Sequence, residues 1–320
     1  MNIVEVKELV KSYGDKFTLQ IHFNLNQGEY LGLVGENGAG KTTLLRIICG
    51  LLRPTSGETT VFGHASKNVK KISKYIGVIN QYTGLPDLLK VREFLKNECV
   101  MRDVDFFSLS DELALLGLDR YLDTKICDLS EGNKRKIVIL KSILHKPKLL
   151  IMDEPTVGID PLTRNEIWSY IRKMKEYGVS AIISTHYLYE IEQICDRVIF
   201  LDRGKVQKEG TVDELIHQNH EVNYLSVTVN GGIDAALEMK LRELLVDDTT
   251  AQDISCSQNS FLLTTRNDSC KVIPHVVQML YSNDIEIRAL NTGVESLEEV
   301  MTQLNKRKSE VKYELERKSI

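Results

Sequence analysis

A strict alternation of apolar and polar residues marks the first strand that the sequence predicts. Its apolar members are separated by single polar residues: Phe17, Leu19, Ile21, Phe23 and Leu25. Side chains of a strand point alternately to its two faces, so this period of two predicts one buried and one solvent-facing side. His22 lies on the polar side, where we expect it to face solvent.

Uninterrupted apolar runs predict further strands. They cover residues 30–34, 75–79, 149–152 and 179–184. Such runs are typical of parallel strands that are covered on both faces. Ligands of open α/β sheets bind beyond the carboxyl ends of the strands. The pattern therefore predicts an α/β fold with its functional site at that edge of the sheet.

The segment from about residue 86 to 145 has helical rather than strand spacing. Val91, Phe94 and Leu95 fall on one helical face, as expected for an amphipathic helix. We interpret this segment as a helical insert within the α/β domain.

A change in pattern near residue 217 predicts a domain boundary, because the apolar rhythm is lost there. We therefore assign residues 1–217 to a main domain, 218–305 to a small α/β domain and 306–320 to a charged tail. In the small domain, strands are predicted at 224–229, 260–265 and 286–290, and helices at 233–245, 270–281 and 295–304.

A glycine-rich loop joins the apolar run at 30–34 to a helical segment. It reads Gly35-Glu36-Asn37-Gly38-Ala39-Gly40-Lys41-Thr42-Thr43. The spacing G-x-x-x-x-G-K-T between a strand and a helix is that of a P-loop, whose backbone N–H groups surround nucleotide phosphates. Lys41 would reach the β- and γ-phosphates, and the Thr42 hydroxyl would hold Mg²⁺. The loop predicts a nucleoside triphosphate site.

Two adjacent carboxylates, Asp153 and Glu154, follow the apolar run at 149–152. Burying two acids is costly unless another group compensates their charge. Mg²⁺ beside Thr42 would compensate Asp153 and leave Glu154 to polarise a water molecule. The pair therefore predicts hydrolysis, although a strand that ends in a polar turn before Pro155 is the alternative.

Other candidate groups lie at strand and helix ends. Gln81 follows the run at 75–79. His186 follows the run at 179–184, and this place at the same sheet edge favours a phosphate contact for His186. Ser130 is placed to cap a helix, and a capped N-terminus is by itself weak evidence for an anion site. The Tyr13 ring is suited equally to stacking on a base and to packing in the fold.

Composition limits the classes of function. The net charge of -4 gives no electrostatic reason to expect a nucleic-acid partner. The 6 cysteines have no C-x-x-C pair, which favours reduced thiols over zinc or disulfides. Charges near Met1 do not fit a signal peptide, and no apolar run is long enough to span a bilayer. We expect any membrane role to come from a partner.

Taken together, the order and spacing of these motifs resemble the ATPase subunit of an ATP-binding cassette (ABC) transporter over roughly residues 1–217. The resemblance is carried by Gly35 to Thr43, Gln81, Leu129 to Asn133, Asp153-Glu154 and His186. It implies a P-loop ATPase fold with an antiparallel β subdomain and a helical insert. It also implies ATP and Mg²⁺ as cofactors, a second ATP-binding subunit of the same or another chain, and an integral membrane permease as partner.

Individual roles follow from the same resemblance. Glu154 resembles the catalytic base and His186 the γ-phosphate sensor. Gln81 resembles the Mg²⁺ ligand that links the metal site to the membrane subunit. The resemblance also implies that Tyr13 stacks on adenine. Ser130 and Gly132 would contact the γ-phosphate of the nucleotide held by the opposite subunit, and Asp160 would help to join the two sites.

The signature segment departs from the family's usual Leu-Ser-Gly-Gly-Gln, because Glu131 and Asn133 replace a glycine and the glutamine. Ser130 and Gly132 are kept, so their implied contacts remain possible. The C-terminal segment, which closes with Gly293 to Met301, resembles the extension of bacterial drug, bacteriocin and lantibiotic exporter ATPases. That second resemblance favours export over import.

We therefore expect an ATPase at the cytoplasmic face of the membrane that drives export of an antimicrobial peptide or drug through a separate membrane subunit. One alternative is a soluble ABC ATPase acting on nucleic acid or ribosomes, although a long coiled coil or second cassette is missing. Another is a P-loop GTPase, but the segment Asn133-Lys134-Arg135-Lys136 lacks the Asp of the Asn-Lys-x-Asp guanine reader.

Overall fold

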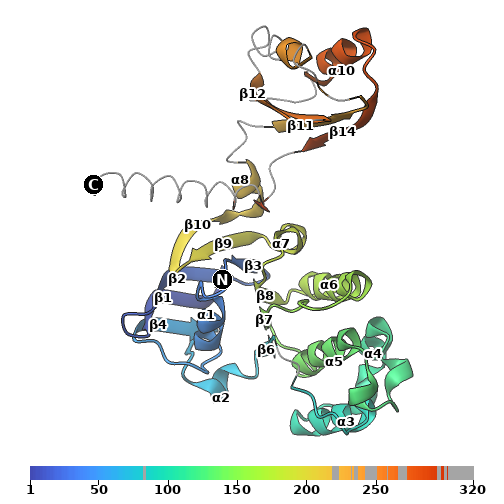
Figure 1. Ribbon diagram of the computed structural model, residues 1–320. Helices are drawn as coiled ribbons and strands as arrows, with labels where there is room; N and C mark the ends of the chain where they lie inside the picture. Colours follow the sequence, from blue (N-terminus) through green and yellow to red (C-terminus); the bar gives the residue numbers. More distant parts are fainter. Residues whose placement is uncertain are drawn as a thin grey trace. The chain divides into compact units, whose positions relative to one another are not determined.

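The computed structural model describes residues 1–81, 84–217, 223–231, 233, 237–241, 251–257, 259–265, 272–293, 297–298 and 301. The chain divides into two compact units, Met1–Gly210 and Thr211–Ile320. Figure 1 shows the elements of each unit, which we describe separately.

The first unit is built on a ten-stranded sheet of order β5-β4-β1-β2-β10-β9-β3-β8-β7-β6. Its strands are β1 (Asn2–Ser12), β2 (Thr18–Asn26), β3 (Tyr30–Val34), β4 (Ser56–Val61), β5 (His64–Ala65), β6 (Ile76–Ile79), β7 (Leu149–Asp153), β8 (Ser180–Ser184), β9 (Arg197–Asp202) and β10 (Lys205–Thr211). Strands β9, β3, β8, β7 and β6 run parallel, whereas β2, β1, β4 and β5 pair antiparallel. The expected α/β fold with an antiparallel β subdomain is confirmed.

The helices of this unit are α1 (Lys41–Ile48), α2 (Val69–Ile72), α3 (Val91–Met101), α4 (Ser110–Leu116), α5 (Glu131–Ile143), α6 (Pro161–Glu176) and α7 (Leu188–Ile194). Short 3₁₀ turns cover Phe106–Leu109, Asp119–Tyr121 and Ile126–Asp128. Helices α3, α4 and α5 lie between β6 and β7 in the chain, as the helical spacing from about residue 86 to 145 predicts.

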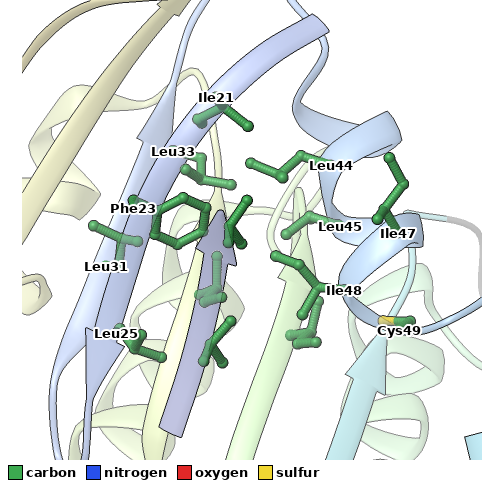
Figure 2. Close-up of a cluster of buried hydrophobic side chains, with 14 of the residues drawn as sticks. Ile21, Phe23, Leu25, Leu31, Leu33, Leu44, Leu45, Ile47, Ile48 and Cys49 are labelled. Carbon is green, nitrogen blue, oxygen red and sulfur yellow. The ribbon is translucent and has the colours of Figure 1, made fainter. Parts of the chain in front are cut away.

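Strand β2 has the alternation that its sequence predicts. Leu19, Ile21, Phe23 and Leu25 are buried, and the polar residues between them, including His22, are exposed. The buried face of β2 meets the apolar face of α1, as Figure 2 shows for Ile21, Phe23, Leu44 and Leu45. This core fixes α1 against the sheet that contains β3, so the glycine-rich loop between β3 and α1 is held at both ends.

The second unit contains a four-stranded antiparallel sheet of order β12-β13-β11-β14. Its elements are α8 (Val212–His217), β11 (Asn223–Val229), β12 (Ala251–Cys256), β13 (Ser260–Thr265), α10 (Val272–Ser282) and β14 (Ile287–Gly293). Residues of α10 pack on the sheet around Phe261, which is 1% exposed.

Three strands and one helix of this unit match those predicted, but β12 was not expected. Its sequence, AQDISC, has only Ile254 and Cys256 as alternating apolar residues, which is too short a pattern to predict a strand. Of the helices predicted at 233–245 and 295–304, the structure describes helical residues at 237–241, 297–298 and 301, and the remainder, like the tail at 306–320, lies outside the described residues. Among the described residues, no helix is both long and apolar enough to cross a bilayer.

Candidate functional site

The glycine-rich loop connects the fully buried strand β3 to helix α1. Gly40, the residue before α1, has a φ of 110°, which side chains with a Cβ rarely adopt. Gly38 has a φ of 83°, and a Cβ at this position would meet no atom within 4 Å. The loop therefore has a backbone shape that needs glycine and leaves open space beside it, as a phosphate-binding loop requires.

Lys41 is the first residue of α1, and its side chain folds back over the loop. It is 6% exposed, and its Nζ donates to the carbonyl oxygens of Gly35, at 2.5 Å, and Glu36, at 3.2 Å. Burial lowers the pKa of Lys41, while the charges of Glu154 and Asp153 act in the opposite direction. The lysine thus lies within the electrostatic reach of both predicted carboxylates.

Asp153 and Glu154 lie where β7 ends, next to the end of β8. The Ser184 hydroxyl donates to Asp153 Oδ1 at 2.5 Å, and the Glu154 N–H donates to the Ser184 carbonyl at 2.9 Å. Glu154 has a φ of 48°, a left-handed conformation that costs free energy in a residue other than glycine. Strained backbone of this kind is enriched at functional sites.

Glu154 contacts both Gln81 and His186, the polar residues predicted at the ends of two other strands. Gln81 Nε2 donates to Glu154 Oε2 at 3.5 Å, and His186 Nδ1 lies 3.5 Å from Glu154 Oε1. The Glu154 side chain is 12% exposed, whereas that of His186 is 47% exposed. The three side chains come from loops after β6, β7 and β8, which are neighbours in the parallel sheet.

A pocket of about 310 Å³ contains the predicted Mg²⁺ ligands Thr42, Gln81 and Asp153. Their donor atoms are a hydroxyl, an amide oxygen and a carboxylate, the hard oxygen ligands that suit Mg²⁺. The residues therefore fit a Mg²⁺ ion, and the shape of the adjoining loop fits the phosphates that would share it.

Tyr13 follows β1 and is 47% exposed. Its ring centroid lies 6.3 Å from that of Phe17. The Phe17 ring in turn closes on Gly40, where an added Cβ would lie 3.0 Å from Phe17 Cζ. Tyr13 is thus an exposed aromatic ring that contacts Phe17, and Phe17 lies beside Gly40 of the glycine-rich loop.

Ser130, Gly132 and Asp160 form a second group at the first turns of α5 and α6. Ser130 caps α5 by accepting from the Asn133 N–H at 3.3 Å, as predicted. Asp160 caps α6 by accepting from the Thr163 N–H at 3.0 Å, which lowers the pKa of its carboxyl group. Gly132 is buried against α6, because a Cβ there would lie 2.6 Å from Thr163 Cγ2. Ser130 and Asp160 themselves are exposed.

Arg135 is a site residue that the sequence did not predict, and its guanidinium group is buried beside the carboxylates. It donates to the backbone carbonyls of Pro155, Glu154, Asn80 and Gln81. Arg135 was considered only as part of an incomplete guanine-binding motif. Arg135 bonds backbone carbonyls, which every residue has, so the sequence does not show which residues are its partners. The available signal is an arginine on the apolar face of a helix, because a buried arginine needs polar partners.

Glu190 on α7 was also missed, and its buried carboxylate joins two of the site loops. Thr156 Oγ1 donates to Glu190 Oε1 at 2.8 Å, and Thr185 Oγ1 donates to Glu190 Oε2 at 3.1 Å. Arg164 Nε lies 3.7 Å from Glu190 Oε1. Thr156 comes two residues after Glu154 and Thr185 directly precedes His186, so this contact connects the supports of both residues.

Comparisons with known proteins agree with this arrangement. The sequence pattern of the ABC transporter family matches residues 19–157. The chain is 35% identical over 259 residues to the linearmycin resistance ATP-binding protein LnrL of Bacillus subtilis, covering 79% of this chain and 83% of that protein. It is 36% identical over 223 residues to the bacitracin transport ATP-binding protein BcrA of Bacillus licheniformis, covering 68% and 73% of the two chains.

Solved structures show the same fold. The ATP-binding subunit of an ABC transporter superposes with a TM-score of 0.62 at 29% identity, covering 68% of this chain and 92% of that chain. A dimeric ATP-binding cassette in a post-hydrolysis state with ADP and phosphate gives a TM-score of 0.57 at 25% identity, covering 65% and 98%. With the P-loop and the paired carboxylates in place, this chain belongs to the ABC transporter family as one of its ATP-hydrolysing, ATP-binding proteins.

Proposed function

We propose that this ATPase powers export of an antimicrobial peptide or a drug through a separate membrane subunit. The proposal rests chiefly on the contact of Glu154 with both Gln81 and His186 at the edge of the sheet that carries the P-loop. It is supported by relatives whose names describe linearmycin resistance, Nod factor export and bacitracin transport. The match to LnrL covers 79% of this chain, more than the main domain alone.

In the proposed reaction, Lys41 and the loop amides hold the phosphates, and Thr42, Asp153 and Gln81 hold Mg²⁺. Bound Mg·ATP supplies the γ-phosphoryl group and the positive charge that offsets its oxygens. The Glu154 carboxylate orients the attacking water and accepts its proton. His186, at 3.5 Å from Glu154, is placed to donate a hydrogen bond to the γ-phosphate.

Glu154 suits this task because its position is set by several contacts. Its side chain is mostly buried, so little solvent competes with the one water molecule that it would orient. Gln81 bonds one carboxylate oxygen and His186 faces the other, which holds the plane of the group. Lys41 adds a nearby positive charge within the same site.

The proposed active unit is a dimer, either of two copies of this chain or of this chain with a second ATP-binding subunit. Ser130 and Asp160 are exposed at adjacent helix starts and are therefore accessible to a nucleotide and to loops of a second subunit. Gly132 keeps the first turn of α5 close to α6 so that both ends present one surface. A solved relative is a dimer that contains ADP and phosphate, which supports this reading.

The proposed location is the cytoplasmic face of the membrane, where the chain binds a permease subunit. The test is purification of the tagged full chain from gently solubilised membranes of its own cells, followed by identification of the proteins that accompany it. We expect a protein with several membrane spans to accompany the chain. Cells that lack this membrane protein should lose resistance to the exported compound. Ribosomal proteins or DNA-bound partners in place of a membrane protein would contradict the proposal and favour the soluble alternative.

A further inference from the structure

We propose that Arg135 is a positioning residue for ATP hydrolysis. It lies on α5, the helix that Ser130 caps, and it fixes the backbones of Gln81 and Glu154 relative to each other. The inference rests on the role proposed above for Glu154. Arg135 does not contact the reacting atoms, and it acts through the residues that do.

The four hydrogen bonds of the Arg135 guanidinium group all go to backbone carbonyls. Nε donates to Pro155 O at 2.5 Å and Nη2 donates to Glu154 O at 2.9 Å. On the other side, Nη1 donates to Asn80 O at 2.5 Å and to Gln81 O at 3.2 Å. One planar group thus bridges the loop after β6 and the loop after β7, a geometry that the single ammonium of a lysine does not reproduce.

Burial makes this arrangement costly, which is evidence that it has a specific purpose. Arg135 is 4% exposed, and burial lowers its pKa to about 10, while the charge of Asp153 acts against this shift. The group therefore remains a cation at neutral pH with four carbonyl oxygens as its hydrogen-bond partners. An apolar side chain at this place would avoid the cost of desolvation but would leave those carbonyls without their donor.

The contacts of Arg135 complete the support of the strained Glu154 backbone. Ser184 accepts from the Glu154 N–H, and Arg135 donates to the Glu154 carbonyl, so the peptide groups on both sides of its Cα are held. The same guanidinium holds the Gln81 carbonyl. Arg135 therefore sets the separation of the two backbones whose side chains meet at 3.5 Å.

A helix connects this contact to the proposed dimer surface. Arg135 lies on α5, which begins at Glu131 directly after its capping residue Ser130. A movement of α5 would carry the guanidinium group with it and change the relative position of Gln81 and Glu154. The structure thereby joins the segment expected to meet the second subunit with the residues expected to carry out hydrolysis.

The test compares Arg135→Lys and Arg135→Gln with Lys136→Gln in the full chain. Lys136 is the neighbouring buried cation of α5, but it pairs with the Glu166 side chain at 2.5 Å instead of the loop carbonyls. We expect both Arg135 variants to lower kcat by about 10- to 100-fold, as misplacement of a catalytic group by about 1 Å does. ATP affinity, measured with a fluorescent ATP analogue, should change by only a few-fold, and Lys136→Gln should keep near wild-type kcat.

A double-variant cycle separates positioning from general damage. In the Glu154→Gln background, Arg135→Lys should cause almost no further loss of the residual activity, because the group it positions is already absent. Wild-type kcat in either folded Arg135 variant, an equal loss in the Glu154→Gln background, or a loss of ATP affinity in proportion to kcat would overturn the inference. Melting temperatures identify the variants that fold. A wild-type rate for Glu154→Gln alone would instead reject the proposed catalytic base.

Discussion

Ser184 and Asp153 are joined by a 2.5 Å hydrogen bond in which the serine hydroxyl donates to the carboxylate. The two residues are direct neighbours across the parallel strands β8 and β7. Asp153 is thereby held by a buried residue of the sheet, and not only by the loop that follows it. Ser184 is itself 0% exposed, so its hydroxyl bonds within the protein and not to bulk water.

Ser184→Ala should weaken Mg²⁺ binding without preventing folding, because it removes the bond that orients Asp153. Loss of such a supporting contact typically lowers metal affinity by about 10- to 100-fold. The Mg²⁺ concentration that gives half-maximal ATPase activity measures the effect. Ser180→Ala is the control, since Ser180 is equally buried at the other end of β8 and bonds the Gly28 N–H. Equal Mg²⁺ dependence of the two variants would contradict the prediction.

Glu154→Gln should keep ATP binding and lower turnover by about 10²- to 10⁴-fold, the usual range for loss of a general base. Glutamine has almost the same shape, so the contacts with Gln81 and His186 can persist while the proton acceptor is lost. Single-turnover hydrolysis and equilibrium binding of ATP measure the two quantities separately. Hydrolysis within a few-fold of wild type would remove Glu154 from this role.

Lys41→Ala should abolish nucleotide binding, because the amine supplies the charge that the β- and γ-phosphates need. In the structure this amine is held by the loop carbonyls of Gly35 and Glu36, close to the expected phosphates. Binding of a fluorescent ATP analogue checks the prediction, with the exposed Lys70→Ala as control. Near-normal ATP affinity of the Lys41 variant would contradict the assignment of residues 35–43 as a P-loop.

Thr156→Val should destabilise the main unit by about 1–3 kcal/mol, the cost of leaving a buried polar group without its partner. Valine has the shape of threonine, but it cannot donate to the Glu190 carboxylate. Thr59→Val is a matched control, because the Thr59 hydroxyl is buried and has no partner among the described residues. Urea unfolding should show a near-neutral or stabilising effect for Thr59→Val, and equal losses in the two variants would argue against the proposed contact.

His145 should make the protein less stable in mild acid. Burial lowers the pKa of His145 and outweighs the hydrogen bond of its Nε2 with the Ile76 carbonyl at 3.0 Å, which acts in the opposite direction. The folded chain thus favours the neutral ring, so stability is lost as pH falls below the unfolded pKa of about 6.5 toward the lower folded value. The melting temperature should fall less between about pH 7.5 and 5.5 in His145→Gln than in wild type. An identical fall in both proteins would contradict this account.

Much of the main fold could be predicted, because the spacing of apolar residues along short segments specifies its strands and helices. The alternation around Ile21 and the apolar run at 149–152 each specify a strand through burial of one face or both. The P-loop was equally clear, since a loop that surrounds phosphates needs glycine at fixed places. In contrast, β12 has few apolar residues, and its pairing with β13 depends on residues distant in the sequence.

The supports of the site could not be predicted in the same way. Arg135 bonds backbone carbonyls from two loops, and no side-chain pattern records such partners. Glu190 and Thr156 lie 34 residues apart in the sequence, with α6 and β8 between them, so their contact depends on the tertiary fold. Sequence motifs thus identified groups expected to touch the nucleotide, while the structure was needed to identify the groups that hold them.

The close packing of Gly132 on Thr163 has a mechanical consequence. Two motifs that lie far apart in the chain, one starting at Ser130 and the other ending at Asp160, share a contact with no room for a single added methyl group. Packing this close leaves little room for one helix start to shift against the other. We therefore expect the two exposed caps to move together when either helix is displaced.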